Sequence, residues 1–549
     1  MKYYENIIIG AGPAGLQCSY FFKKYNIPYL ILERNNLCGS FFNSYPHSGK
    51  LISINKKYTG NDNKDFNLRH DWNSLLNDDD FLFNTYSDNF YPNREVLLNY
   101  LNDFAKKYEL QIKFNRNAYK IEKDDNNNKY IIYVKNKKKI KNGKNGGKKE
   151  EKEEKYICKN LIIASGLSKP YTPPFILDVK DPIKHYADYP QNYFLDKDNL
   201  EEFKAKTVLI IGGGNSSFEL ANILNEITKS VFVVGRNNRN WAMSSHYGGD
   251  IRSIYLPFMD TFLLKVMNAI DYNKTFDKNN LVIRQNDKGS QYNVSISIKD
   301  LNGKIIDFID GGRNNYDKII ICTGWNFDNS IYNFNIAMTN NNKFPSINYN
   351  FESVNNKNLF FIGSLMHSVD FRKSSGGFLS GFRYLIKFFI NINYQIPLDY
   401  IEFNYKSRDD IIKLVDHIIH RINTSSDMYQ MFGYLGDIFY YNLQEGKVHY
   451  FKNVHINGNY FKNDINIIIF KLTLDFGERE TDIMKVGEKK SFIGSESRAH
   501  LIHPILKIYN SHSLSIIDII HFDEELFSEF TDTSKYHEKL FRILKSFLP

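Results

Sequence analysis

Apolar residues gather in short runs, each followed by a glycine-rich turn and then by an amphipathic stretch. Residues 6–9 (NIII) precede GAGPAG, and residues 208–211 (VLII) precede GGGNSS. Short apolar runs that end at glycine are typical of buried parallel strands, and the stretches after them have the helical period. The pattern therefore predicts strand, tight turn and helix at two places in the chain.

A turn of this kind can place a pyrophosphate on a helix N-terminus. One glycine makes the bend, one lets the backbone approach the phosphates, and the third lets helix and strand pack closely. Two such turns indicate a protein that holds two dinucleotides and passes electrons between them. The predicted phosphate-binding residues are Gly10, Gly12 and Gly15 in the first turn, and Gly212, Gly214 and Ser217, a small replacement for the third glycine, in the second.

The strand after each turn indicates which dinucleotide is bound. Residues 29–32 predict a strand that ends in Glu33, where an acid can accept hydrogen bonds from ribose hydroxyls, as in FAD and NAD sites. Residues 230–234 predict the matching strand in the second unit, but Arg236 and Arg239 follow it instead of an acid. A guanidinium there suits the 2′-phosphate of NADPH. The alternative is that Arg236 is a solvated cation at a strand end.

Two small-residue turns, at 164–166 (ASG) and 322–326 (CTGWN), are typical of crossings between two nucleotide-binding domains. A further buried strand ends at Gly363, and Ser374, Gly376 and Gly377 are predicted to open a helix that runs to about residue 390. Its N-terminal N–H groups could stabilise negative charge on a flavin or its pyrophosphate. A simple capped helix is the alternative.

These elements predict an α/β fold with two Rossmann-like domains and a mixed α+β C-terminal region. We expect an FAD-binding domain in two parts, 1–205 and 330–397, an inserted NAD(P)H-binding domain at 206–329, and a C-terminal domain of unknown role at 398–549. In the last, helices are predicted at 407–422 and 536–547 and a strand at 465–474.

The formal net charge of +9 does not indicate nucleic-acid binding. Residues 135–155 hold ten lysines and four glutamates, which supplies most of the excess. The stretch is low in complexity and lacks an apolar period, so we interpret it as a disordered loop between strands 130–134 and 156–163. A basic arm for acidic partners is the rarer alternative.

Four cysteines without a CxxC motif argue against a dithiol relay beside a flavin. His417 and His420 lie one helical turn apart without a visible third ligand, so no metal site is expected. The sequence shows no signal peptide, retrieval tetrapeptide or transmembrane segment, which favours a cytoplasmic protein.

Longer segments carry a family resemblance. The paired turns with the CTGWNFD crossing resemble the flavin-containing monooxygenase superfamily, and His185 and Tyr189 fit the end of its FxGxxxHxxxY fingerprint, although Val179 and Asp181 replace Phe and Gly. The segments KLISINKKYTG (50–60), FNLRHDWNSLL (66–76), HSVDFRKSSGGF (367–378) and YQMFG (429–433) resemble the FAD-dependent oxidoreductase domain-containing protein 2 family.

That resemblance implies a non-covalent FAD enzyme of the endoplasmic-reticulum lumen, which assists the disposal of misfolded glycoproteins together with the luminal degradation machinery. It leaves the electron acceptor unknown. The superfamily also implies a monooxygenase alternative that oxygenates N- or S-nucleophiles, in which Asn55 would hydrogen-bond the oxygenated flavin. The alternative for Asn55 is that it is simply an asparagine in a turn. A third possibility is a flavin-binding scaffold with little turnover.

Overall fold

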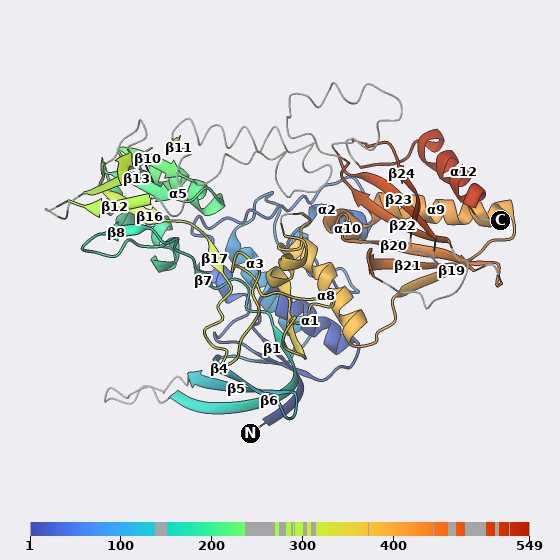
Figure 1. Ribbon diagram of the computed structural model, residues 1–549, viewed down its shortest axis with the longest axis horizontal. Helices are drawn as coiled ribbons and strands as arrows, with labels where there is room; N and C mark the ends of the chain where they lie inside the picture. Colours follow the sequence, from blue (N-terminus) through green and yellow to red (C-terminus); the bar gives the residue numbers. More distant parts are fainter. Residues whose placement is uncertain are drawn as a thin grey trace.

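The computed structural model places three bodies of secondary structure side by side (Figure 1). The first glycine-rich turn lies in the central body, the second turn lies in the body at one end, and the C-terminal sheet lies at the other end. The residues that the structure describes are 2–137, 151–235, 270–273, 281–286, 289, 291–299, 305–308, 315–371, 373–442, 444–458, 468–477, 501–510, 515–525 and 528–547.

The central body is built on a seven-stranded sheet in the order β3-β2-β1-β6-β5-β4, with β18 also paired to β6. Strands β1 (Lys2–Ile9), β2 (Tyr29–Leu32), β3 (Ile112–Lys113) and β18 (Leu359–Phe361) run parallel to their neighbours, as does β6 (Glu151–Ile163) to β1. In register, Ile9 lies between Leu32 and Ile163. Parallel strands are buried on both faces, which explains their unbroken apolar runs.

Helices cover one face of this sheet. Helix α1 (Pro13–Lys24) packs against α8 (Leu379–Asn393) and α3 (Arg94–Lys107). Their apolar faces form the largest core cluster, which includes Phe22, Phe104 and Phe389. The predicted helix after residue 374 begins later than expected, because residues 374–377 turn around a buried aspartate and Phe378 is the N-cap of α8.

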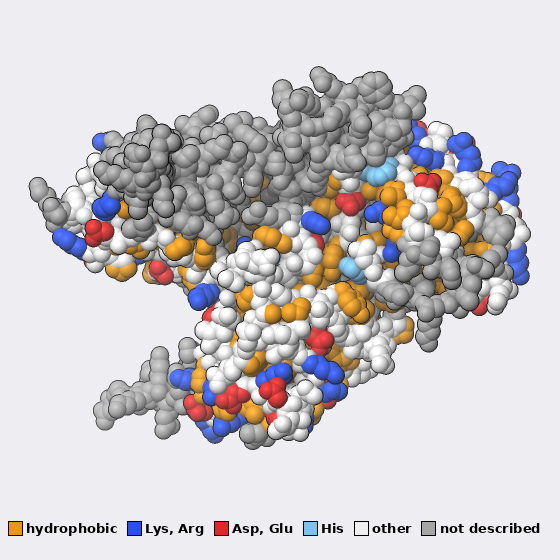
Figure 2. Space-filling view, in the orientation of Figure 1, with side chains coloured by type: hydrophobic (Ala, Val, Ile, Leu, Met, Phe, Trp, Pro, Cys, Tyr) orange, Lys and Arg blue, Asp and Glu red, His pale blue; other side chains and the backbone are white. Residues whose placement is uncertain are grey.

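The prediction of disorder across residues 135–155 is wrong at both ends of that stretch. Strand β5 (Lys129–Lys137) and β6 continue into it as an antiparallel ladder in which Lys135 faces Glu153. Lys135 and Glu153 carry opposite charges, and Arg116 of β4 (Arg116–Asp124) contacts Glu154 at 3.1 Å, which favours the ladder. Acidic and basic side chains lie intermixed over β4–β6 (Figure 2). Residues 138–150 lie outside the described part of the chain.

The second glycine-rich turn belongs to a four-stranded parallel sheet in the order β11-β10-β9-β16. It contains β9 (Thr207–Ile211), β10 (Ser230–Val234), β11 (Ile270–Asn273) and β16 (Lys318–Ile321). Helix α5 (Asn215–Asn225) follows β9. A second sheet packs behind it and holds β8 (Ile176–Asp178), β12 (Leu281–Gln285), β13 (Tyr292–Lys299), β14 (Ile305–Phe308) and β15 (Asn315–Tyr316).

The C-terminal body is a six-stranded antiparallel sheet in the order β19-β21-β20-β22-β23-β24. Helices α9 (Arg408–Thr424) and α12 (Glu538–Phe547) cover one face, close to the ranges predicted from the apolar spacing. The strands are β19 (Asp399–Asn404), β20 (Leu435–Asn442), β21 (Lys447–His455), β22 (Ile468–Asp475), β23 (His503–Asn510) and β24 (Ile516–His521).

One buried arginine ties this body to the central one. Arg69 of α2 (Lys64–His70) is 1% exposed and donates to the carbonyl oxygens of Ile422 at 2.8 Å, Ser425 at 3.2 Å and Ser528 at 3.5 Å. Ile422 lies in the last turn of α9 and Ser425 caps that helix, where carbonyls lack intrahelical partners. The guanidinium therefore satisfies groups that the helix itself leaves open.

Candidate active site

The first glycine-rich turn has the shape that a pyrophosphate requires. A side chain at Gly15 would come within 2.0 Å of the Gly10 carbonyl oxygen, and one at Gly10 would come within 2.9 Å of the Ala164 oxygen. These two glycines therefore serve close packing. At Gly12, the N-cap of α1, no atom lies within 4 Å of the added carbon. Open space lies in front of this helix end.

Both helices that follow glycine-rich turns lack a side-chain cap and an acidic residue in the first turn. Helix α9 differs, because Ser407 and Asp410 form a capping box there. The first N–H groups of a helix need an acceptor, and an anion can supply it. The ends of α1 and α5 therefore have the chemistry of two anion sites.

Glu33 contacts the first glycine-rich turn directly. Its Oε2 accepts a hydrogen bond from the Ala11 N–H at 2.8 Å, and its Oε1 accepts one from the Asn35 N–H at 2.9 Å. The carboxylate is 5% exposed and is oriented by the turn itself. The position agrees with the spacing argument, in which an acid at the end of the second strand faces the dinucleotide.

Gly363 packs against the first turn of helix α1. A side chain there would meet the Ala14 Cβ at 2.5 Å, and its φ of +75° also favours glycine. Ser374 points inward and hydrogen-bonds the Asp370 carboxylate. Gly376 and Gly377 pack against Asp370 and against the ring of His367. These residues line the region between the N-termini of α1 and α8. Their direct contact with a cofactor stays a prediction.

The second turn repeats the first. A side chain at Gly212 would come within 2.3 Å of the Cys322 carbonyl oxygen, whereas the space at Gly214, the N-cap of α5, is open for 4 Å. Ser217 is fully buried, and its Oγ lies close to Gly212, so it takes the packing role of the third glycine. Arg236 and Arg239 lie outside the described residues.

An aromatic cluster lies at the crossing between the two bodies. The strands β7 (Lys169–Pro170) and β17 (Trp325–Asn326) pair antiparallel there. The Trp325 ring lies 5.1 Å from Tyr45, 5.7 Å from His185 and 6.2 Å from Phe41, which is 47% exposed. Burial lowers the pKa of His185, which keeps this imidazole neutral. The cluster gives the crossing an apolar wall.

Helix α5 also contacts the central body directly. Glu219 accepts a hydrogen bond from the Ser48 hydroxyl at 2.8 Å, and burial raises the pKa of its carboxyl to about 7. Arg94 holds the loop that carries Ser48, by donating to the carbonyl oxygens of Ser44 and Pro46 at 2.5 and 2.7 Å. The two dinucleotide-type units therefore meet through a titratable hydrogen bond.

The cysteines do not offer a thiol relay. Cys18, Cys38, Cys158 and Cys322 are all buried and free of disulfide bonds. Burial raises the pKa of each thiol, to about 12 at Cys38, where Glu33 adds to the effect. A thiol is nucleophilic as the thiolate, so these four act as small apolar core residues.

Comparisons with known proteins agree with this geometry. Residues 7–363 match the model of the family described as pyridine nucleotide-disulphide oxidoreductase. The chain is 30% identical over 535 residues to a mouse (Mus musculus) protein named FAD-dependent oxidoreductase domain-containing protein 2, with 91% of this chain and 75% of that protein covered. The zebrafish (Danio rerio) protein of the same name is 30% identical, with 92% and 76% covered.

The chain belongs to the FAD-dependent oxidoreductase domain-containing protein 2 family. It is thus an FAD-dependent oxidoreductase, and its family implies FAD and a pyridine nucleotide as cofactors. Among solved structures, a flavin-containing monooxygenase from Stenotrophomonas maltophilia is similar at 16% identity and a TM-score of 0.47, with 70% of this chain and 97% of that chain covered.

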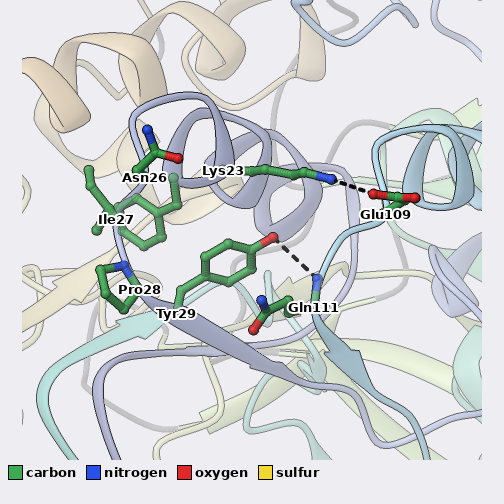
Figure 3. Close-up of a pocket in the computed structure, with 8 residues that line it drawn as sticks. Lys23, Asn26, Ile27, Pro28, Tyr29, Glu109 and Gln111 are labelled. Atoms are coloured by element: carbon green, nitrogen blue, oxygen red, sulfur yellow. Dashed lines mark hydrogen bonds and ion pairs between the residues drawn. The ribbon is translucent and has the colours of Figure 1, made fainter.

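The open glycines and the uncapped helix ends fit these cofactors. In this family member, FAD would lie on the α1 end with Glu33 toward its ribose, and the pyridine nucleotide would lie on the α5 end. The pocket of about 380 Å³ in Figure 3 is a different place. It lies at the opposite end of α1, beside Lys23, Tyr29 and Glu109, and at the amino end of β2. Dinucleotides bind at the carboxyl ends of strands.

The side chain of Asn55 contacts the loop at residues 87–89. Its side-chain amide donates to the carbonyl oxygens of Ser87 at 2.7 Å and Asn89 at 3.2 Å. Both amide hydrogens thus hold the 87–89 loop, and the predicted catalytic role stays untested. Among the residues described, no helix has the length and apolar character needed to cross a bilayer.

The sequence analysis assigned no role to His367, to the Trp325 ring or to Glu219. His367 lies in a 3-10 helix, Gly363–Val369, and its Nδ1 lies 3.4 Å from the carboxylate of Asp370, which caps that helix. Tyr45 and Trp325 are far apart in the sequence. No local periodicity marks such contacts, and only the DFRKSSGG stretch gave a signal near one of them.

Proposed function

We propose that this protein is an NADPH-dependent flavoprotein that transfers a hydride from NADPH to FAD and passes the electrons to an external acceptor. Two uncapped helix ends, each fronted by a glycine with open space, carry this proposal. The preference for NADPH over NADH rests on Arg236 and Arg239, where an acid would be expected for NADH.

FAD supplies the hydride chemistry, and the residues of the chain bind, orient and enclose it. Gly12 and the α1 N–H groups receive the FAD pyrophosphate, and Glu33 accepts from the ribose. Gly214 and α5 do the same for the second pyrophosphate. The rings of Phe41, Tyr45 and Trp325 form the apolar wall of the crossing between the two sites, and an apolar wall limits the access of water.

The acceptor is external because the buried thiols cannot relay electrons. The finer role that the family resemblance implies, luminal assistance in the disposal of misfolded glycoproteins, is part of this proposal. It is tested by whether FAD-loaded protein and its Gly12→Val variant differ in supporting degradation of a misfolded glycoprotein. The monooxygenase alternative named Asn55 as the residue that would hydrogen-bond the oxygenated flavin, and both amide hydrogens of Asn55 are instead donated to Ser87 and Asn89.

A reciprocal pair of variants tests the two cofactor sites. Valine at Gly12 or at Gly214 meets no protein atom at its Cβ, so the fold should survive, while the β-branched side chain fills the space for a pyrophosphate. We expect Gly12→Val to lose bound FAD. Gly214→Val should keep FAD but lose its anaerobic reduction by NADPH, while a chemical reductant still bleaches the flavin. Normal FAD content in Gly12→Val would refute the first assignment, and normal reduction in Gly214→Val the second.

A further inference from the structure

A buried histidine and a buried aspartate lie in the corner between the ends of α1 and α8. The 3-10 helix Gly363–Val369 begins against Ala14 in the first turn of α1. His367 lies four residues farther on, and a side chain at Gly377 would meet its ring at 3.0 Å. Gly377 directly precedes Phe378, the N-cap of α8. His367 therefore lies beside the N-terminus of α8, in the same 3-10 helix whose first residue contacts the N-terminus of α1.

Asp370 is fixed so that one oxygen faces this imidazole. Its Oδ2 accepts hydrogen bonds from the hydroxyl and the N–H of Ser374. Its Oδ1 is buried and lies 3.4 Å from the Nδ1 of His367. Asp370 is 5% exposed and His367 9%, so solvent contributes little to their charge balance.

The other groups around the imidazole are mostly rings. Phe344 and Phe371 lie 6.0 and 5.4 Å from the His367 ring, both edge-on. Among the described residues, Lys343 is a charged group on this side, with its Nζ 5.4 Å from the Phe344 ring and 5.7 Å from the Phe371 ring. A nearby carboxylate stabilises an imidazolium and apolar rings oppose it, so a new negative charge in the same buried corner would add to the effect of the carboxylate.

We propose that His367, oriented by Asp370, takes up the proton that balances the charge of the reduced FAD. This inference rests on the proposed function. A hydride carries two electrons and one proton, so its arrival gives a neutral flavin ring one negative charge. A solvent proton then adds to His367, and the imidazolium compensates that charge in the buried site. When the acceptor removes a hydride equivalent from the ring, the proton leaves His367.

The slope of the flavin midpoint potential against pH counts the protons taken up with each electron pair, and it tests the inference without turnover. We would measure it on FAD-loaded full-length protein, by equilibration with redox dyes across neutral pH. In His367→Gln the slope should fall to about half, because one of the two coupled protons is lost. Asp370→Asn should lower it in the same direction, because Asp370 is the positioning residue. His420→Gln, at an exposed site on α9, is the matched control and should keep the original slope.

An unchanged slope in His367→Gln would overturn the inference. If that variant alone loses FAD, the slope of Asp370→Asn decides in the same way. Loss of FAD from both variants would mean that the pair holds the cofactor rather than its proton, which also overturns it. Unmodified protein that binds no FAD would refute the proposed function itself, whereas FAD-loaded, NADPH-reducible protein with unchanged slopes refutes this inference alone.

Discussion

Replacing Arg69 with methionine should loosen the C-terminal body from the central one. The guanidinium makes two well-formed hydrogen bonds, to the carbonyl oxygens of Ile422 and Ser425, and a third, longer one to Ser528. It also lies 4.8 Å from the centre of the Tyr429 ring. Methionine keeps much of the aliphatic packing but removes the charged donor from those carbonyls.

The expected cost follows from these contacts. A hydrogen bond from a charged donor contributes about 1.5–3 kcal/mol, so the two short ones together contribute roughly 3–6 kcal/mol. The substitution also removes the free-energy cost of burying the guanidinium charge, because a buried charge is costly even when it is paired. This gain offsets part of the loss. We therefore expect Arg69→Met to lower the free energy of unfolding by about 3 kcal/mol.

Urea unfolding measures this loss, and Trp72 gives a local signal. Its indole N–H donates to the Arg69 carbonyl oxygen at 3.0 Å, so its emission should change when this contact opens. Arg542→Met is the matched control, because Arg542 is exposed on α12, and it should change the free energy by less than about 0.5 kcal/mol. A loss below about 1 kcal/mol in Arg69→Met would refute the idea that Arg69 joins the two bodies.

Three further outcomes are expected. Burial raises the pKa of Glu219 from 4.5 to about 7. The stability that comes from its protonated form is therefore complete below pH 4.5 and is lost as the pH rises through 7. In Glu219→Gln, the melting temperature should depend less steeply on pH across this range. Gly15→Ala should unfold at markedly lower urea than Gly12→Ala, because only the former meets a carbonyl oxygen at 2.0 Å. Arg236→Ala should raise the NADPH concentration for half-maximal flavin reduction about ten- to a hundredfold and leave NADH unchanged; equal shifts for both would contradict a 2′-phosphate contact.

Local patterns predicted the elements around the glycine-rich turns well. The strands 29–32 and 230–234 were predicted at the bounds that the structure gives, because a buried parallel strand is an unbroken apolar run that stops at a polar or glycine residue. The helix at α9 was likewise visible from its spacing. Glu33 lies where its distance from the glycines indicated.

Such local patterns could not predict contacts that depend on the folded chain. The start of α8 was predicted too early, because the Ser374 hydroxyl and N–H turn toward Asp370 and hold residues 374–377 out of the helix. The Lys-rich stretch was predicted to be disordered along its whole length, because its composition hides the cross-strand pairing of lysine with glutamate. His367 begins the family-like segment at 367–378, but the sequence assigned it no role, because its contacts involve Gly363 and Gly377 on either side of it.

The pairing of β18 with β6 has a consequence for how the chain is made. The ribosome must synthesise the whole second dinucleotide unit before β18 can join the first sheet and α8 can cover α1. Until then, the apolar face of α1 has no partner from α8, and the turn at Gly12 lacks the support of Gly363. Domains generally fold as units during synthesis, so an incomplete one leaves hydrophobic surface open to aggregation. We therefore expect nascent chains that stop before residue 393 to engage chaperones and to bind no FAD.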